Sequence, residues 1–244
     1  AGSLKGVVLS VCPDATLVDI GHDIPAHDVL AGALELAACY RYFPSGTIFL
    51  VVVDPGVGSS RRGIAADIGD YRFVAPDNGV LSAVFHESPP RKVVELTERK
   101  YARPTISRTF EGRDRFAPAA GHLAKGIALL SLGKRIKDFH VIDLPRPTVS
   151  AQDLVGEIVR VDRFGNLITN VPAALLDGPR ERWRAGLDGR SAPARGTYAE
   201  VERGALVALV DSFGFWELAV RDGSAAAELG LGPGAPVRFE RIRR

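Results

Sequence analysis

Short apolar runs alternate with helix-like patterns along the first part of the chain. Phe49–Val53 are five consecutive apolar residues rich in β-branching, which predicts a short strand buried on both faces. Asp28 is expected to cap a helix over Val29–Tyr40, while Leu4–Val11 reads equally as a strand or as the end of a helix. Further strands are expected at Ala15–Ile20, Ile64–Ile68, Tyr71–Ala75 and Lys92–Leu96, and further helices at Val80–Phe85 and Phe116–Gly126. The strands at Ile64–Ile68 and Tyr71–Ala75 are expected to form a hairpin around Gly69-Asp70. This alternation predicts an α/β domain with a mainly parallel sheet over residues 1–146.

The pattern changes after a proline-containing linker at Pro145–Ser150. Short strand-like runs separated by turn residues follow, with little helix, and Gly178–Thr197 is rich in Arg and Gly and is expected to be exposed. A smaller, mostly β domain over residues 151–244 is therefore predicted. Its expected strands are Gly156–Val161, Asn166–Val171, Tyr198–Val201, Leu206–Val210, Phe215–Val220 and Val237–Ile242.

Composition narrows the class of protein but does not identify it. The chain is 46% hydrophobic and 25% charged, and its net charge of +2 is too small to indicate a nucleic-acid or membrane partner. Cys12 and Cys39 lack metal-ligand spacing and are expected to be buried free thiols, which suits a reducing compartment. No run reaches the roughly 18 apolar residues of a membrane span, so we expect a cytoplasmic protein. Because the chain contains no Met, we also expect that its natural N-terminus lies before Ala1.

The candidate chemistry begins with Asp54, which follows the strand at Phe49–Val53 directly. Open α/β sheets bind ligands beyond the carboxyl ends of their strands, and Arg61 returns seven residues later. The alternative is that Asp54 caps a structural turn. Other polar loops also follow apolar runs, with aromatic residues near them, which favours a ligand with a flat ring and a polar tail. These loops are Pro76–Gly79, Thr109–Asp114 and Asp162–Asn166.

Four motifs taken together resemble one enzyme family. VVDPGVGSSRR, APDNGVLS, TFEGRDRFAPAAGHLAKG and VDRFGNLITNV, in this order and spacing, are similar to the S-adenosylmethionine (SAM) hydroxide adenosyltransferases. These adenosine-forming SAM hydrolases are related to fluorinase and chlorinase. The resemblance implies hydrolysis of SAM at ribose C5′ to adenosine and L-methionine, with no metal and no cofactor. It also implies a homotrimer whose sites lie between the N-terminal domain of one subunit and the C-terminal domain of the next.

The resemblance also assigns roles to individual residues. It implies that Asp54 aims the attacking water, that Arg61 holds this carboxylate, and that Glu111 stands where the family often has a histidine. In the substrate pocket, Asn78 would line the N-terminal side and Tyr198 would stack on adenine. The other implied contacts to the base and the amino-acid end are Phe110, Asp162, Phe164, Asn166, Ser212 and Arg221.

Two alternatives stay open. A SAM-dependent halogenase is disfavoured by Asp54, because the halogenating relatives lack this carboxylate and a fixed anion repels a halide. A non-catalytic SAM- or adenosine-binding protein is motivated by Glu111, and by the family's D-x-Y segment, which would lie before Ala1.

Overall fold

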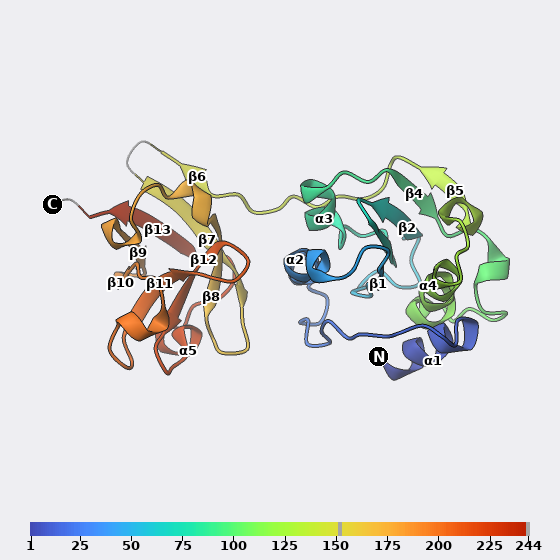
Figure 1. Cartoon of the computed structure of the whole chain (residues 1–244), viewed down its shortest axis with the longest axis horizontal. Helices are drawn as coiled ribbons and strands as arrows, with labels where there is room; N and C mark the ends of the chain where they lie inside the picture. The colour runs from blue at the N-terminus through green and yellow to red at the C-terminus, as the bar shows by residue number, and fades with distance from the viewer. Residues whose placement is uncertain (151–152, 243–244) are drawn as a thin grey trace. The chain divides into compact units, whose positions relative to one another are not determined.

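The computed structural model describes residues 1–150 and 153–242 of the chain. It divides the chain into two compact units, Ala1–Leu144 and Pro145–Arg244, which Figure 1 draws from blue to yellow-green and from yellow to red.

The sheet of the first unit is mixed. Its strands lie in the order β1-β3-β2-β4-β5, and of these neighbours only β1 and β3 run parallel. The prediction of a mainly parallel sheet is therefore wrong. The cause is local: β2 turns into β3 through Gly69, whose φ is +54°, and a tight turn can join only antiparallel strands. The strands are β1 Ile48–Leu50, β2 Gly63–Ile68, β3 Tyr71–Pro76, β4 Lys92–Glu95 and β5 Lys134–Ile136.

Helices cover both faces of this sheet. α2 (Val29–Cys39) and α3 (Ser82–Glu87) pack on the face that carries Phe49 and Phe73, and α4 (Ala117–Ala124) packs on the face that carries Val74. Figure 1 shows α2 and α4 on opposite sides of β1. Successive side chains of β3 therefore pack into two different cores, one on each face of the sheet. Asp28 caps α2 as predicted, because its Oδ1 accepts a hydrogen bond from Ala31 N at 2.8 Å.

The N-terminal region settles one open alternative and departs from expectation in two other places. Gly2–Val11 form a helix, α1, which packs Val7 and Val8 against α4, so the helical alternative holds there. Ala15–Ile20 form no strand, and Val18 is 64% exposed. The predicted strand at Phe49–Val53 is also shorter than expected: its ladder covers Ile48–Leu50, and Val52 is 38% exposed, so burial on both faces is wrong.

The second unit is an antiparallel sheet that nearly closes on itself. The strand order is β10-β9-β13-β7-β8-β12-β11, with β6 beside β7, and an isolated bridge between Ala194 and Ala208 brings the two end strands together. Trp216 and Phe239 fill its core. The strands are β6 Thr148–Val149, β7 Asp153–Val161, β8 Leu167–Pro172, β9 Trp183–Leu187, β10 Arg190–Pro193, β11 Leu206–Val210, β12 Phe215–Val220 and β13 Pro236–Arg241.

Three sequence predictions for this unit need correction. Gly178–Thr197 is not simply an exposed segment, because it holds β9 and β10 and buries Ala185 completely. Tyr198–Glu200 form a 3₁₀ turn rather than the start of a strand. The linker carries the short strand β6, and α5 (Ala225–Leu229), capped by Ser224, was not anticipated. Other 3₁₀ turns fall at Tyr40–Tyr42, Arg99–Tyr101, Leu129–Leu132, Ala173–Leu175 and Arg180–Arg182.

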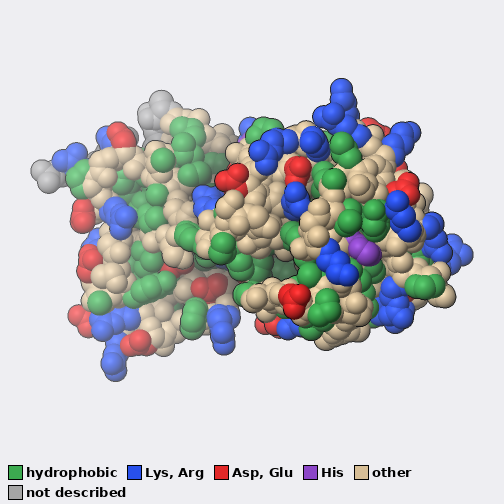
Figure 2. Space-filling view, turned by 45° about the vertical axis from the view of Figure 1, so that its right-hand side comes forward, with side chains coloured by type: hydrophobic (Ala, Val, Ile, Leu, Met, Phe, Trp, Pro, Cys, Tyr) green, Lys and Arg blue, Asp and Glu red, His purple; other side chains and the backbone are tan. Residues whose placement is uncertain are grey.

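The surface carries no large block of one charge on the face drawn in Figure 2, where Lys and Arg side chains are interleaved with acidic and apolar ones. Over residues 1–150 and 153–242, no helix has both the length and the apolar character that a bilayer crossing requires. Cys12 and Cys39 are not joined in a disulfide, and both are half-buried rather than buried as expected.

Candidate active site

A tight loop carries the chain away from β1 immediately after Asp54. Val57 N donates to Asp54 O at 3.3 Å, which closes the first turn. Gly58 then adopts a φ of +80°, and a Cβ added there would lie 2.5 Å from the backbone oxygen of Arg108. A side chain is therefore excluded at Gly58 both by its conformation and by the close approach. The glycine lets this loop lie against the segment that leads to Glu111.

Arg61 joins the two carboxylates across this contact. Its Nη2 donates to Asp54 Oδ2 at 2.7 Å and to Glu111 Oε2 at 2.8 Å, although Arg61 and Glu111 stand 50 positions apart. The side chains of Arg61, Asp54 and Glu111 are only 7%, 6% and 15% exposed. The guanidinium also lies over the ring of Phe116, 5.2 Å from its centroid. The three residues that the family resemblance assigned to catalysis thus form one buried cluster.

The two oxygens of Asp54 have different surroundings. Oδ2 is bound to Arg61, whereas Oδ1 is buried and has no hydrogen-bond partner within the described part of the chain. Burial raises the pKa of Asp54, and the charge of Glu111 adds to this rise. The charge and hydrogen bond of Arg61 and the nearby backbone N–H of Gly56 oppose it. A buried carboxylate with one oxygen fixed and the other without a donor can accept a hydrogen bond from a small bound molecule such as water.

Glu111 stands at the start of a π-helical turn, η3 (Gly112–Phe116), that leads into α4. Such turns are frequent at functional sites. A Cβ at Gly112 would lie 2.9 Å from Val52 Cγ1, so this glycine lets the turn approach the chain just before Asp54. Arg115, four residues beyond Glu111, places its Nη2 3.5 Å from Glu111 Oε1. Arg115 was not singled out from the sequence, although its spacing of four residues from an acid on a helical turn was an available signal.

The other two candidate residues of the first unit, Asn78 and Phe110, contact the backbone and a neighbouring arginine. Asn78 Nδ2 donates to Val53 O at 2.8 Å, and Asn78 Oδ1 accepts from Val80 N at 3.1 Å, so the amide holds the backbone just before Asp54. Phe110 is half-buried and lies under the guanidinium of Arg113, at 4.9 Å.

The charged neighbours of these residues are also paired within the first unit. Arg113 pairs with the buried Asp114 at 2.7 and 2.8 Å, so the charge of this carboxylate is compensated by its neighbour in the chain. Arg62 binds Asp77 and Asp138 beside an open depression of about 500 Å³.

In the second unit, Asp162 organises a loop between β7 and β8. Its Oδ1 accepts from the backbone N–H groups of Phe164 and Asn166 at 2.8 Å each, and its Oδ2 accepts from Asn166 Nδ2 at 3.0 Å. Gly165 between them has a φ of +84°. This loop presents the ring of Phe164, which is 69% exposed. The Phe164 ring is thus exposed on a loop whose polar groups are largely hydrogen-bonded to one another.

A second carboxylate lies beneath the candidate residues of this unit. Tyr198, which is 40% exposed, donates its hydroxyl hydrogen bond to Glu217 on β12, which is 3% exposed. Burial raises the pKa of Glu217, and the charges of Asp211 and Asp162 raise it further. Glu217 was missed from the sequence, where the signal was one acid inside the apolar run FWELAV.

Ser212 and Arg221 differ in how far they are free to meet a ligand. Ser212 is exposed in the turn before β12. Arg221 donates to Val201 O at 2.7 Å, so part of its guanidinium is used by the protein itself. Across the described residues, no group of three or more His, Cys, Asp or Glu side chains is arranged to hold a metal ion.

Comparison with known proteins addresses the resemblance directly. Models of the SAM hydroxide adenosyltransferase N-terminal and C-terminal domains match residues 1–133 and 156–238. An (R)-S-adenosyl-L-methionine hydrolase of Thermus thermophilus is 39% identical over 97% of this chain and 92% of its own, and one of Salinispora tropica is 38% identical over 96% and 89%. A fluorinase of Nocardia brasiliensis is 32% identical over 97% of this chain and 90% of its own.

A solved structure gives the same result at the level of the fold. The crystal structure of an uncharacterized conserved protein from Thermotoga maritima superposes with a TM-score of 0.93 at 35% identity, covering 98% of this chain and 94% of that one. The matched domain models span more than half of the sequence and include all four motifs. The resemblance is confirmed: the chain belongs to the SAM hydroxide adenosyltransferase family.

Proposed function

We propose that this protein hydrolyses S-adenosyl-L-methionine at ribose C5′, releasing adenosine and L-methionine. The observation that carries the proposal is the buried carboxylate of Asp54, with Oδ2 held by Arg61 at 2.7 Å and Oδ1 without a donor within the described residues. The hydrolase relatives, at 36% to 39% identity over nearly the whole chain, support the same reaction.

The chemistry requires little beyond a well-placed nucleophile. A water oxygen attacks C5′ opposite to sulfur, the C–O bond forms as the C–S bond breaks, and the electron pair of that bond neutralises the sulfonium. Because a sulfonium is already a good leaving group, no acid is needed to expel methionine. The water gives up one proton, first to the Asp54 carboxylate and then to solvent. Positioning of this kind contributes about 7–11 kcal/mol, and a base contributes roughly 10²–10⁴-fold.

Asp54 suits the role of base because two opposing effects act on it. Burial raises its pKa, which makes the carboxylate a stronger proton acceptor, and Arg61 keeps it ionised. Arg61 also fixes the orientation of the carboxylate, so that Oδ1 faces the nucleophile. Neither a metal nor a cofactor is invoked.

We infer that the substrate is held by residues of both units. Phe110, Phe164 and Tyr198 offer aromatic faces for adenine, and Asn78, Asp162, Asn166, Ser212 and Arg221 offer polar groups for the ribose and the amino acid. We further infer a homotrimer in which the N-terminal unit of one subunit meets the C-terminal unit of the next. A cytoplasmic location agrees with an intracellular substrate such as SAM.

The test is incubation of purified protein with SAM, followed by separation of the nucleosides by chromatography. Stoichiometric adenosine and methionine support the proposal, and SAM that stays intact would favour a binding protein instead. Sedimentation of the same sample tests the trimer.

Halogenation is the second candidate, because fluorinases are among the relatives. Asp54 argues against it. Two like unit charges 4 Å apart repel by about 4 kcal/mol at an effective dielectric constant of about 20, so a halide beside this carboxylate is disfavoured. Parallel reactions in chloride and in fluoride decide the matter: 5′-halogenated nucleoside formed faster than adenosine would refute hydrolysis as the main activity.

A further inference from the structure

The buried cluster around Arg61 contains one more charge than the proposed reaction has used. Asp54 and Glu111 are two carboxylates, and both accept from the same atom, Arg61 Nη2. Two anions on one cation would leave an uncompensated negative charge among side chains that are at most 15% exposed. Buried charges are strongly destabilised unless they are paired. A second cation is therefore needed, and Arg115 is the one in contact with Glu111.

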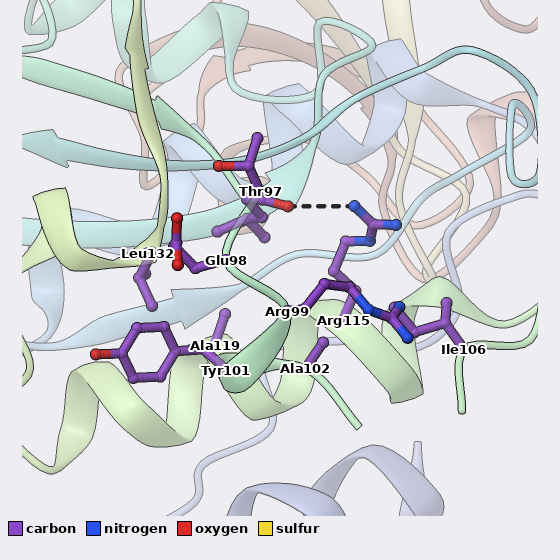
Figure 3. A pocket seen from close by; sticks show the side chains of 10 residues that line it. Thr97, Glu98, Arg99, Tyr101, Ala102, Ile106, Arg115, Ala119 and Leu132 are labelled. Atoms are coloured by element: carbon purple, nitrogen blue, oxygen red, sulfur yellow. Dashed lines mark hydrogen bonds between the residues drawn. The ribbon is translucent and has the colours of Figure 1, made fainter. Parts of the chain in front are cut away.

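Arg115 is held firmly enough to act as a fixed charge. Its Nη1 donates to Leu96 O, just beyond β4, at 3.2 Å. Figure 3 shows Arg115 from close by, with a dashed line that marks this hydrogen bond. Arg115 lines a cavity of about 20 Å³ together with Tyr101 and Leu132. The side chain is 31% exposed, whereas its Nε is buried without a partner within the described residues. The hydrogen bond to Leu96 O therefore fixes the position of the Arg115 guanidinium relative to Glu111.

We propose that Arg115 is a positioning residue for the reaction, which acts on Asp54 through Glu111 and Arg61. The order of contacts is Arg115 to Glu111 at 3.5 Å, Glu111 to Arg61 at 2.8 Å and Arg61 to Asp54 at 2.7 Å. By neutralising Glu111, Arg115 keeps that carboxylate from drawing Arg61 away from Asp54. A histidine at position 111 could carry a positive charge itself. Here Glu111 and Arg115 together supply the arrangement that this chain uses. The inference rests on the proposed hydrolysis.

The competing explanation is structural, because Arg115 also anchors Leu96. Five variants separate the two roles. Arg115→Gln and Arg115→Met remove the charge, the second while keeping bulk in the small cavity, and Arg115→Lys keeps the charge. Glu111→Gln removes the carboxylate alone, and Glu111→Gln combined with Arg115→Gln removes both partners. Arg41→Gln is the matched control, because Arg41 makes an exposed ion pair with Glu87 in the same unit.

The readouts are kcat and KM for adenosine release from SAM, together with the melting temperature. We expect the neutral variants to lose kcat by roughly 10- to 100-fold with KM within about twofold, the scale expected when a reacting group is misplaced by about 1 Å. Arg115→Lys should recover at least part of kcat. In the Glu111→Gln background, the further loss of Arg115 should change kcat by less than about threefold, because the two residues act as a unit.

Several results would overturn the inference. They are a kcat for Arg115→Gln or Arg115→Met equal to that of Arg41→Gln, a lysine variant no better than the methionine one, or an equal loss with and without Glu111. Failure of both neutral variants to fold would assign Arg115 to structure alone. Wild-type protein that released no adenosine would instead refute the proposed function, which keeps the two failures distinct.

Discussion

Replacing Asp54 by asparagine removes the proposed base and leaves the shape of the site nearly unchanged. The carboxylate is 6% exposed, with Oδ2 bound to Arg61 at 2.7 Å and Oδ1 buried without a hydrogen-bond partner among residues 1–150 and 153–242. An amide keeps one acceptor oxygen but cannot take a proton. If the amide oxygen accepts the hydrogen bond from Arg61, the amide NH₂ group faces the water and offers it no acceptor. The expected cost is that of a general base, roughly 10²–10⁴-fold in kcat, or about 2.7–5.4 kcal/mol of transition-state free energy.

The assay is adenosine release from saturating SAM, with the melting temperature as a check on folding. The matched control is Asp70→Asn, at the turn between β2 and β3, where the side chain is exposed. The control should keep the wild-type rate. If Asp54→Asn released adenosine at the wild-type rate while remaining folded, Asp54 would not be the base, and the carboxylate would be the structural cap of its turn.

The pH dependence gives a second measurement on the same residue. The carboxylate works as a base only when ionised, so kcat/KM should fall as the solution is made acidic. Because burial raises the pKa of Asp54 above the ordinary value of 3.8, the fall should be centred above pH 3.8. The Asp54→Asn variant should show a flat profile over the same range. An unchanged acid limb in the variant would assign the titration to another group.

Two further predictions concern stability. A Cβ at Gly63 would lie 2.4 Å from the ring of Phe116, on which Arg61 rests, so Gly63→Ala should lower the free energy of unfolding by about 1–3 kcal/mol and also reduce kcat. Gly6→Ala in α1, where a Cβ meets nothing within 4 Å, is the control and should be neutral or stabilising in urea unfolding. Burial raises the pKa of Glu217 in the folded protein above its value in the unfolded chain. The contribution of this carboxyl group to the free energy of unfolding is therefore complete below the unfolded pKa and is lost as the pH rises through the folded pKa. Glu217→Gln should therefore stabilise the protein at pH 8 by about 1.4 kcal/mol for each pKa unit, and should have little effect near pH 4. Equal effects at the two pH values, or a larger effect for the exposed Glu228→Gln, would contradict this reasoning.

Local features of the fold followed from the residue pattern. The cap at Asp28, the hairpin that turns at Gly69 and the mostly β character of the residues after 150 depend on neighbours in the chain, and each is present. The order of the polar motifs was also sufficient to indicate the family. Such features are set by side-chain chemistry within a few residues of one another.

Other features depended on contacts between distant segments, and the predictions made for these features from the sequence were wrong. The β2–β3 hairpin is local, but the antiparallel pairings of β4 with β2 and of β5 with β4 join segments far apart in the chain, and these pairings could not be predicted from the sequence. Ala15–Ile20 have a strand-like pattern but form no strand, because apolar alternation alone does not provide a partner.

The site shows the same division. Residue types placed an acid and an arginine near the end of a strand, seven positions apart, and this much could be read directly from the chain. Only the folded protein brought Glu111 across 50 positions to Arg61, set Arg115 behind it and buried Glu217 under Tyr198. The physical reason is that charges interact through space and are strengthened by burial, and both distance and burial are properties of the packed structure rather than of the order of residues.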